Sequence, residues 1–519
     1  MKTKIGFCMF LLAAGLCGLA QAYSWTSQEW CVDDCVPSFK IDVNSFTSRG
    51  ITSNVVDQLI DAAPVWNTMG EDLCIGNNNN SGTCYGENTM CARYEYQDDD
   101  LVGALAYCKL FWDIDFDCGF FELGNDHYYH VYNASYPFGF KAQNAKTANG
   151  FISVSMHEFG HSMSLGDYPG ATGPNALMSY TSFKIPHSDD ATGLINRYGY
   201  RNQGIKTRLA SSINYTDGSL GTWSAIQQWG GSDYLTSLRP AIVGNWHQGI
   251  GGTYEWDYAA AWTVGTNIKI ALLKDLADNT VQVKAIATIP VGNTLYAPSI
   301  AVGSANQLLV VWKNVGNSGN NYANYLTVAR VQVNSGGTGF TSITTSTLSP
   351  YQPLSEPVVT FMPGRYRYVI SWVMDGSSVT NSRHRIAAMV SSNSEGSAWN
   401  APYTYEGSDP NFPEFVTSPW QAPAITCYNN LLTSATCLMM YKQFRTSDTR
   451  FIDQQAFAMD ANNTKLMTNS TDWSTWNYSH VAPQIASSLS DWLYTHVFYS
   501  GGKGTMMYRI STRPTHHVL

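Results

Sequence analysis

The spacing of hydrophobic residues changes near residue 200 of this 519-residue chain. Before that point, some segments alternate apolar and polar residues as strands do, and others repeat apolar residues at helical spacing. After it, short apolar runs separated by Gly, Asn and Ser recur with little helical period. We therefore expect a mixed N-terminal part and an all-β C-terminal part. In the N-terminal part the pattern predicts strands at 39–43 and 111–116, a helix at 55–60 capped by Ser53, and a helix at 150–165 ended by Gly166.

The C-terminal part is built from repeated units. Each unit opens with a proline followed closely by apolar residues, and most continue with a second and a third strand. Four strands in about 60 residues are typical of a propeller blade, whose radial repetition leaves only short sheet edges. Five blades are favoured, with residues 205–238 completing the last unit; six result if that segment forms its own blade, and an irregular pair of β-sandwiches is the alternative. The prolines are Pro240, Pro298, Pro357, Pro423 and Pro483.

The first 22 residues have the pattern of a secretory signal peptide. Lys2 and Lys4 precede an apolar segment at 5–20, and an Ala-x-Ala cleavage site ends at Ala22. We expect the exported chain to begin at Tyr23. No apolar run of about 18 residues follows, so an integral membrane protein is not expected. The expected divisions are a signal peptide at 1–22, a first domain at 23–200 and a propeller at 201–519.

Composition agrees with export. Hydrophobic residues make up 44% of the chain and charged residues only 13%, and the formal net charge of −9 argues against a nucleic-acid partner. Of the eleven cysteines, seven fall within residues 31–118, and most should form disulfides in an oxidising compartment. Cys427 and Cys437 flank a turn signal, which predicts a cross-strand disulfide.

One segment carries metal chemistry. His157, Glu158 and His161 form an H-E-x-x-H pattern, and on a helix residues four apart share a face, so both imidazoles can reach one ion. Zn²⁺ favours such nitrogen ligands. Gly166 turns the chain, and Asp167 then stands where a third ligand is needed; a carboxylate suits zinc as well. We expect one catalytic zinc ion, and no pattern indicates structural Ca²⁺.

These motifs resemble the signature of the metzincin zinc peptidases, and of matrixins in particular. The resemblance covers residues 38–200 and implies an α+β metzincin-like catalytic domain. Two departures are that Asp167 replaces the usual histidine and Ser164 the usual glycine. The segments that carry the resemblance are the first strand at 39–46, the active-site helix at 151–161, a Met-turn at 176–180 around Met178, and a C-terminal helix at 185–199.

The resemblance implies a secreted zinc endopeptidase that cleaves a protein or peptide substrate. Its metal ligands would be His157, His161 and Asp167, and Glu158 would take a proton from the attacking water. Tyr180 would contact the zinc or the developing oxyanion, as the equivalent tyrosine of some family members does.

The turns of the C-terminal repeats resemble degenerate Asp-boxes of sialidase-like propellers. Glycine precedes an aromatic residue at 217–223, 336–340 and 395–399. The propeller would then bind substrate, a glycan or a cell surface. Two alternatives stay open: a secreted binding protein or adhesin with an inactive metzincin domain, and a glycoside hydrolase, which would need an arginine triad with a Tyr–Glu pair.

Overall fold

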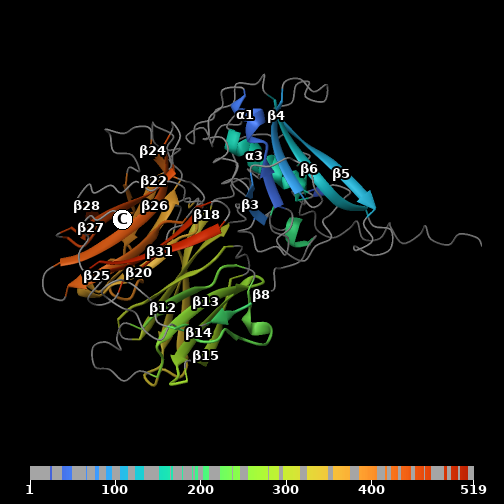
Figure 1. The fold of residues 1–519 in the computed structure, drawn as a ribbon. Coiled ribbons are helices and arrows are strands. Elements are labelled where there is room, and N and C mark those ends of the chain that lie inside the picture. The colour runs from blue at the N-terminus through green and yellow to red at the C-terminus, as the bar shows by residue number, and fades with distance from the viewer. Residues whose placement is uncertain are drawn as a thin grey trace, which may run out of the picture.

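The described chain is mostly β-sheet (Figure 1). The computed structural model describes residues 24–25 and 38–48, separate segments between 66 and 196, and most of residues 203–511. Helices are few, and the two α-helices with defined bounds, α1 (Val43–Thr47) and α3 (Phe151–Ser162), both lie in the N-terminal part. Among the described residues, no helix has the length and hydropathy needed to cross a membrane.

A mixed five-stranded sheet organises the N-terminal part. Its order is β3-β2-β4-β6-β5, with β2 parallel to β3 and β4, β4 parallel to β6, and β5 antiparallel to β6. Helix α3 contacts β5 and β6, so the sheet supports the helix that carries the H-E-x-x-H residues. The strands are β2 (Ser38–Ile41), β3 (Gly76–Asn80), β4 (Thr89–Glu95), β5 (Ala106–Ile114) and β6 (Leu123–Asn133).

The sequence located three of these elements, with some ends misplaced, and missed the others. The two expected strands correspond to β2 and to the second half of β5. Helix α3 ends at Ser162, before Gly166, because β7 (Leu165–Gly166) is already extended chain that pairs with β1 (Ser24–Trp25). Helix α1 was not expected; the side chain of Asp42 caps it by accepting a hydrogen bond from the Ser45 N–H at 3.2 Å. The helix expected at 55–60 lies outside the described residues.

Five antiparallel sheets follow one another after residue 240. Each of the first three is a four-stranded meander; the fourth sheet also contains β24 beside β26, and the fifth has three described strands. Their strands are β12 (Ala241–Gly244), β13 (Tyr258–Val264), β14 (Asn267–Asp275) and β15 (Val281–Pro290); β16 (Ser299–Val302), β17 (Gln307–Val315), β18 (Asn324–Val333) and β19 (Phe340–Leu348); β20 (Val358–Met362), β21 (Arg367–Met374), β22 (Arg385–Val390) and β23 (Tyr403–Tyr405); β24 (Phe415–Thr417), β25 (Ala424–Asn430), β26 (Ser434–Arg445), β27 (Arg450–Met459) and β28 (Leu466–Thr468); β29 (Gln484–Ser487), β30 (Trp492–Ser500) and β31 (Lys503–Ser511).

The five sheets have the radial arrangement of a β-propeller. Strand β12 contacts β16, β16 contacts β20, β20 contacts β25, and β25 contacts β29, so the strands that open successive sheets lie next to one another. Each of these strands begins directly after one of the five predicted prolines. Proline cannot donate to a β-ladder and is tolerated at the start of a strand. The repeat of about 60 residues predicted from the sequence is therefore confirmed.

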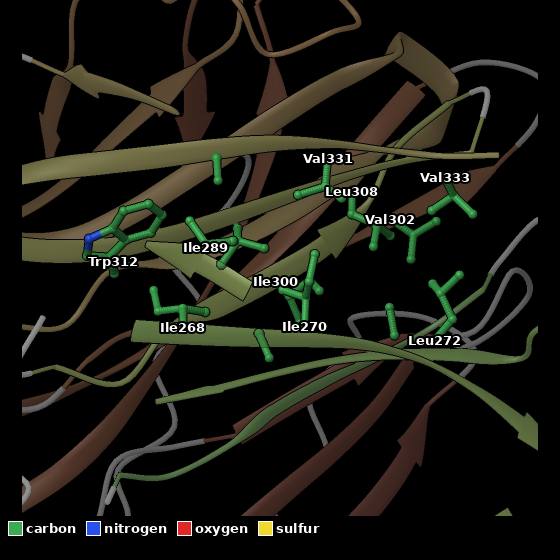
Figure 2. Packing of buried hydrophobic residues seen from close by; sticks show 14 of the residues in the cluster. Ile268, Ile270, Leu272, Ile289, Ile300, Val302, Leu308, Trp312, Val331 and Val333 are labelled. Atoms are coloured by element: carbon green, nitrogen blue, oxygen red, sulfur yellow. The ribbon is translucent and has the colours of Figure 1, made fainter. Parts of the chain in front are cut away.

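Apolar side chains from neighbouring sheets form the cores between them (Figure 2). Ile268, Ile270 and Leu272 of the first sheet face Ile300 and Val302 of the second. A similar cluster joins the second sheet to the third, and another joins the third to the fourth. Because each of the first three sheets buries apolar side chains on both faces, simple alternation is a poor guide to their inner strands.

Residues 205–238 pack against the first sheet rather than completing the last. Together with the two residues before them, they form the short pairs β8 (Gln203–Gly204) with β11 (Leu235–Thr236) and β9 (Lys206–Thr207) with β10 (Gln227–Gln228). Trp229 packs against Trp262 with ring centroids 6.2 Å apart, and the Trp262 indole N–H donates to the Asp233 carbonyl at 2.9 Å. The described strands of this segment pair with one another and pack against the first sheet, and in the described residues none of them pairs with β31.

The turn between the third and fourth strands repeats in three sheets. In each, an Asn or Asp side chain accepts a hydrogen bond from the backbone N–H four residues later, at 2.9, 3.1 and 2.6 Å. The residue three positions after it has positive φ, which glycine and asparagine tolerate best. Two of these turns are the glycine-containing turns expected from the sequence. The three pairs are Asn334 with Gly337, Asn393 with Gly396, and Asp460 with Asn463.

We expect Asp460→Ala to destabilise the fourth sheet by about 1 kcal/mol, because Thr464 and Lys465 lose the acceptor of their hydrogen bonds. Asp460→Asn is the matched control, since the two sister turns use asparagine. Hydrogen bonds, first that from the Thr464 hydroxyl, hold the pKa of Asp460 below its usual value. The stability that aspartate adds is therefore present above the unfolded pKa of about 4 and lost as pH falls through the lower folded pKa. Thermal denaturation at several pH values measures the difference in stability between the variants. Equal melting temperatures for the alanine variant and the parent would contradict the prediction.

A buried lysine lies where the second sheet meets the N-terminal part. Lys313 Nζ sits 3.8 Å above the ring of Tyr296, and the residue is 3% exposed. Burial lowers the pKa of Lys313 to about 7 even though the carboxylate of Glu356 opposes the shift. Burial also raises the pKa of Tyr296, with smaller contributions from Asp190 and Glu356. Asp190 belongs to the N-terminal part, so this cluster joins the two halves of the chain.

The lowered pKa of Lys313 makes stability depend on pH. The unfolded chain binds this proton below about pH 10.4, while the folded chain does so only below about 7, so stability rises with pH across that window. The free energy of unfolding can change by at most about 1.4 kcal/mol per pH unit through the titration of this one lysine. We expect Lys313→Met to remove that rise, and melting of both proteins at intervals from pH 6 to about 10 measures the difference. Parallel pH profiles for parent and variant would show that the lysine is protonated in the folded state throughout.

The expectation of an α+β metzincin-like domain is not supported. The described chain is mostly sheet with few helices, and the helix expected at 55–60 lies outside the described residues. The sequence argument depended on local motifs, and a local motif fixes the positions of a few side chains without fixing a fold class.

Candidate metal centre

Helix α3 presents two histidines on one face. His157 and His161 are four residues apart, and their rings lie 4.7 Å apart at nearly a right angle, 88°. The chain leaves the helix at Ser162 and returns as β7, so that Asp167 faces both rings. Asp167 Oδ1 lies 3.2 Å from His157 Nε2 and 3.4 Å from His161 Nε2.

The three side chains form a cluster of metal-binding type. One ligand atom from each of His157, His161 and Asp167 falls within 4.8 Å of the others. The side chains are partly exposed, so an ion and a substrate can reach them. Nitrogen and carboxylate oxygen donors together suit Zn²⁺ and related transition metals. The sequence prediction that these three residues come together agrees with this geometry, while the identity of the ion stays a prediction.

Glu158 lies beside the cluster as a buried carboxylate. It is only 5% exposed, and its oxygen Oε2 has no hydrogen-bond partner among the described residues. Burial raises the pKa of Glu158, and both histidines oppose the shift. A buried carboxylate oxygen without a partner is costly unless a ligand satisfies it. The carboxylate is also close enough to His157, His161 and Asp167 for their charges to influence its pKa.

His161 is oriented from both sides. Its Nδ1 lies 2.9 Å from the Leu165 carbonyl oxygen, which leaves Nε2 directed at Asp167. Burial disfavours protonation of His161, but Asp167, Glu158 and the Leu165 carbonyl outweigh it and raise the pKa to about 9. A backbone carbonyl on the far nitrogen of a histidine is a common device for fixing a metal-binding tautomer.

A close packing contact supports the helix from below. A Cβ atom added at Gly160 would collide with the sulfur of Met178 and lie 2.7 Å from the ring of Trp66. The Trp66 indole N–H donates to the Met156 carbonyl at 2.9 Å, in a fully buried setting. Met178 therefore packs against the helix that carries the two histidines. Trp66 was missed by the sequence analysis, because nothing in its local pattern links it to a helix about 90 residues later.

The support reaches the propeller. The carboxylate of Asp190, which is 1% exposed, accepts a hydrogen bond from the Met178 N–H at 3.4 Å. Asp190 also lies close enough to Tyr296 of the propeller to contribute to the raised pKa of that phenol. Met178 thus contacts the metal helix on one side and a residue at the junction with the propeller on the other.

Two residues named from the sequence lie outside the described residues: Tyr180, expected to contact the metal or the oxyanion, and Ser164, which replaces the glycine usual in the resembled family.

The disulfide expected between Cys427 and Cys437 is confirmed. The two residues lie opposite each other on β25 and β26.

The propeller contains its own cavity of about 1040 Å³ along the axis. Its walls come from the strands that open the first four sheets, β12, β16, β20 and β25. Four of the charged side chains in its lining have partners. Glu356 accepts a hydrogen bond from the Ala297 N–H at 3.0 Å and lies 3.7 Å from Arg239. Asp257 pairs with Lys274 at 3.2 Å.

Comparison with known proteins finds likeness only among solved structures. No family model and no curated protein matches the chain. An N-acetylgalactosamine deacetylase from F. plautii, solved with blood group B trisaccharide, is 13% identical over 52% of this chain and 87% of that chain, with a TM-score of 0.31. An endo-arabinase from Bacteroides thetaiotaomicron is 13% identical over 49% and 88%, with a TM-score of 0.34. A sialidase from Streptococcus pneumoniae is 11% identical over 59% and 40%, with a TM-score of 0.30.

These findings correct the family and the activity expected from the sequence. The matched structures named above act on carbohydrates, and none is a zinc peptidase. The assignment to matrixin-like metzincins is therefore wrong, and so is the assignment as a metalloendopeptidase acting on peptides. The physical reason is that H-E-x-x-H and a following carboxylate specify how an ion is held and how water is activated. They do not specify which carbonyl the water attacks.

We expect the protein to bind one Zn²⁺ through the three-residue cluster. Asp167→Asn should weaken zinc binding at least tenfold, because the amide lacks the negative charge that offsets the ion. Glu255→Gln, which removes a carboxylate exposed at 60% on the propeller, is the control and should bind zinc as the parent does. Elemental analysis and competition with a chromogenic chelator measure both. Equal affinity in the Asp167 variant would remove this residue from the ligand set.

Proposed function

We propose that this chain is a secreted, zinc-dependent, carbohydrate-active enzyme that removes an acyl group from a glycan by adding water to an ester or amide carbonyl. The observation that carries the proposal is the buried oxygen Oε2 of Glu158, which has no partner among the described residues and lies beside the metal-binding cluster. A carboxylate in that place supports proton transfer to and from water.

The cluster supports hydrolysis of a carbonyl rather than of a glycosidic bond. When bound, zinc would act as a Lewis acid and lower the pKa of a coordinated water from about 15.7 towards 7. Glu158 would accept the proton of the attacking water and pass it to the departing oxygen or nitrogen as the acyl bond breaks. Tyr180 is our candidate donor to the oxyanion that develops on the carbonyl. Glycosidic hydrolysis instead uses two carboxylates, one on each side of the bond.

The axial cavity supports a glycan as the ligand of the propeller. Its volume of about 1040 Å³ is at the upper end for small-molecule sites and gives room for several sugar units. Polar side chains such as Asn245 and Lys274 share its lining with apolar strand residues. The rim carboxylates of Glu356 and Asp257 already have partners, which supports a binding role for the cavity rather than a catalytic one.

Export of the chain follows from the same proposal. The signal peptide expected at residues 1–22 would direct the chain out of the cell, where glycans are presented. The Cys427–Cys437 disulfide supports an oxidising compartment.

We expect Glu158→Gln to lower acetate release from N-acetylated chitooligosaccharides or acetylated xylan by about 10²–10⁴-fold, because the amide cannot take a proton from water. Its zinc content should match the parent's, since Glu158 is not one of the three cluster residues. Acetate is measured by an enzyme-coupled assay on zinc-loaded protein, with Glu255→Gln as the matched amide control.

Two results would overturn this function. One is acetate release that is unchanged in Glu158→Gln, which would place the chemistry elsewhere. The other is no acetate release by the zinc-loaded parent from any acetylated glycan tested. Casein is assayed in parallel, and its degradation without acetate release would indicate a peptidase instead of a deacylase.

A further inference from the structure

The chain that carries the third ligand is paired with the start of the described structure. Strand β7 pairs antiparallel with β1, in a register that sets Ser24 opposite Gly166 and Trp25 opposite Leu165. These two strands form a sheet of their own. The partner of β7 is therefore a two-residue strand that lies about 140 residues earlier in the chain.

Both residues of β7 are linked to the metal centre. The carbonyl of Leu165 faces Nδ1 of His161 at 2.9 Å, and Gly166 directly precedes Asp167. The position of β7 therefore sets the orientation of one ligand and the position of another. Helix α3 also contacts β7, which begins only a few residues after the helix ends at Ser162.

We infer that β1 is a positioning element of the metal centre: its backbone pairing holds β7 so that His161 and Asp167 converge on one ion. This inference rests on the metal site of the proposed function. A short segment after a helix loses conformational entropy when it is fixed, and pairing with β1 fixes it before the ion arrives. A preorganised site binds more tightly because less ordering remains to be done on binding.

The place of β1 in the sequence gives this pairing a biological consequence. The expected cleavage after Ala22 leaves Ser24 as the second residue of the exported chain. The precursor, in contrast, carries its signal peptide one residue before this strand. With cleavage after Ala22, the new N-terminus of the exported chain would lie beside the strand that supports the metal centre.

The test compares zinc binding by two variants of the processed, full-length protein. Ser24→Pro combined with Trp25→Pro removes both N–H groups that could donate to β7, whichever of the two does so. Ser24→Thr combined with Trp25→Val keeps the backbone able to pair and is the matched control. We expect the double-proline variant to bind Zn²⁺ about 10–100-fold more weakly than the control, the size of effect seen when outer support of a metal ligand is lost.

Replacing Zn²⁺ with Co²⁺ adds a spectroscopic measurement that a general loss of stability would not change. The visible absorption of bound Co²⁺ reports ligand geometry, and we expect it to change in the double-proline variant at saturating metal while the control matches the parent. Equal zinc affinity and equal Co²⁺ spectra in both variants would overturn the inference. If the parent itself binds no metal, the proposed function fails instead, so the two failures are distinguishable.

Hydrogen exchange on the unaltered protein covers the case in which the double-proline variant does not fold. We expect zinc to increase the protection of backbone amides in β1 and in β7 together, because each strand holds the other. Protection that increases in β7 alone would overturn the role of β1.

Discussion

Helix α3 can bring its histidines to the metal centre only because Gly160 has no side chain. The helix is pressed against Met178 and Trp66 at that residue, where even a methyl group would overlap the methionine sulfur. This contact fixes the height and rotation of the helix. Since His157 and His161 are held by the same backbone, the glycine determines where both imidazoles lie relative to Asp167. The chemistry of the centre thus depends on a packing contact beside the face of the helix that carries the two histidines.

The propeller is held together by a different principle. The second and third sheets are sandwiched between neighbouring sheets, and apolar side chains interdigitate across each interface, as between the first and second sheets. Contacts of this kind extend from one sheet to the next, so the ring is built from repeated local interfaces. The junction with the N-terminal part is polar instead: Asp190, Tyr296 and Lys313 are buried together there. A buried polar junction requires one particular arrangement, and it therefore supports a defined orientation of the two parts.

Parts of this structure could be predicted from the sequence because their signals are local. The prolines that open each sheet marked the repeat, and the i, i+4 spacing of two histidines marked the metal helix. The burial of Glu158, the contact of Trp66 and the pairing of Ser24–Trp25 with Leu165–Gly166 were not predictable in this way. Each depends on residues far apart in the chain, and a single sequence carries no signal for such contacts. The activity was misassigned for a related reason, because the ligands of an ion are local while the substrate is chosen by the surrounding surface.

The charges at the centre give an independent reason to assign a cation to it. Glu158 is buried and Asp167 is partly exposed, and the two carboxylates lie near the same pair of imidazoles. Two carboxylates close together in a partly buried site are unfavourable unless positive charge is present. The raised pKa of His161, about 9, expresses this demand, because a proton on the ring is the cation that the chain itself can supply. A divalent ion held by His157, His161 and Asp167 would satisfy the same demand more fully, because it carries two positive charges. The features that favour a proton on His161 are thus those that favour a metal ion in its place.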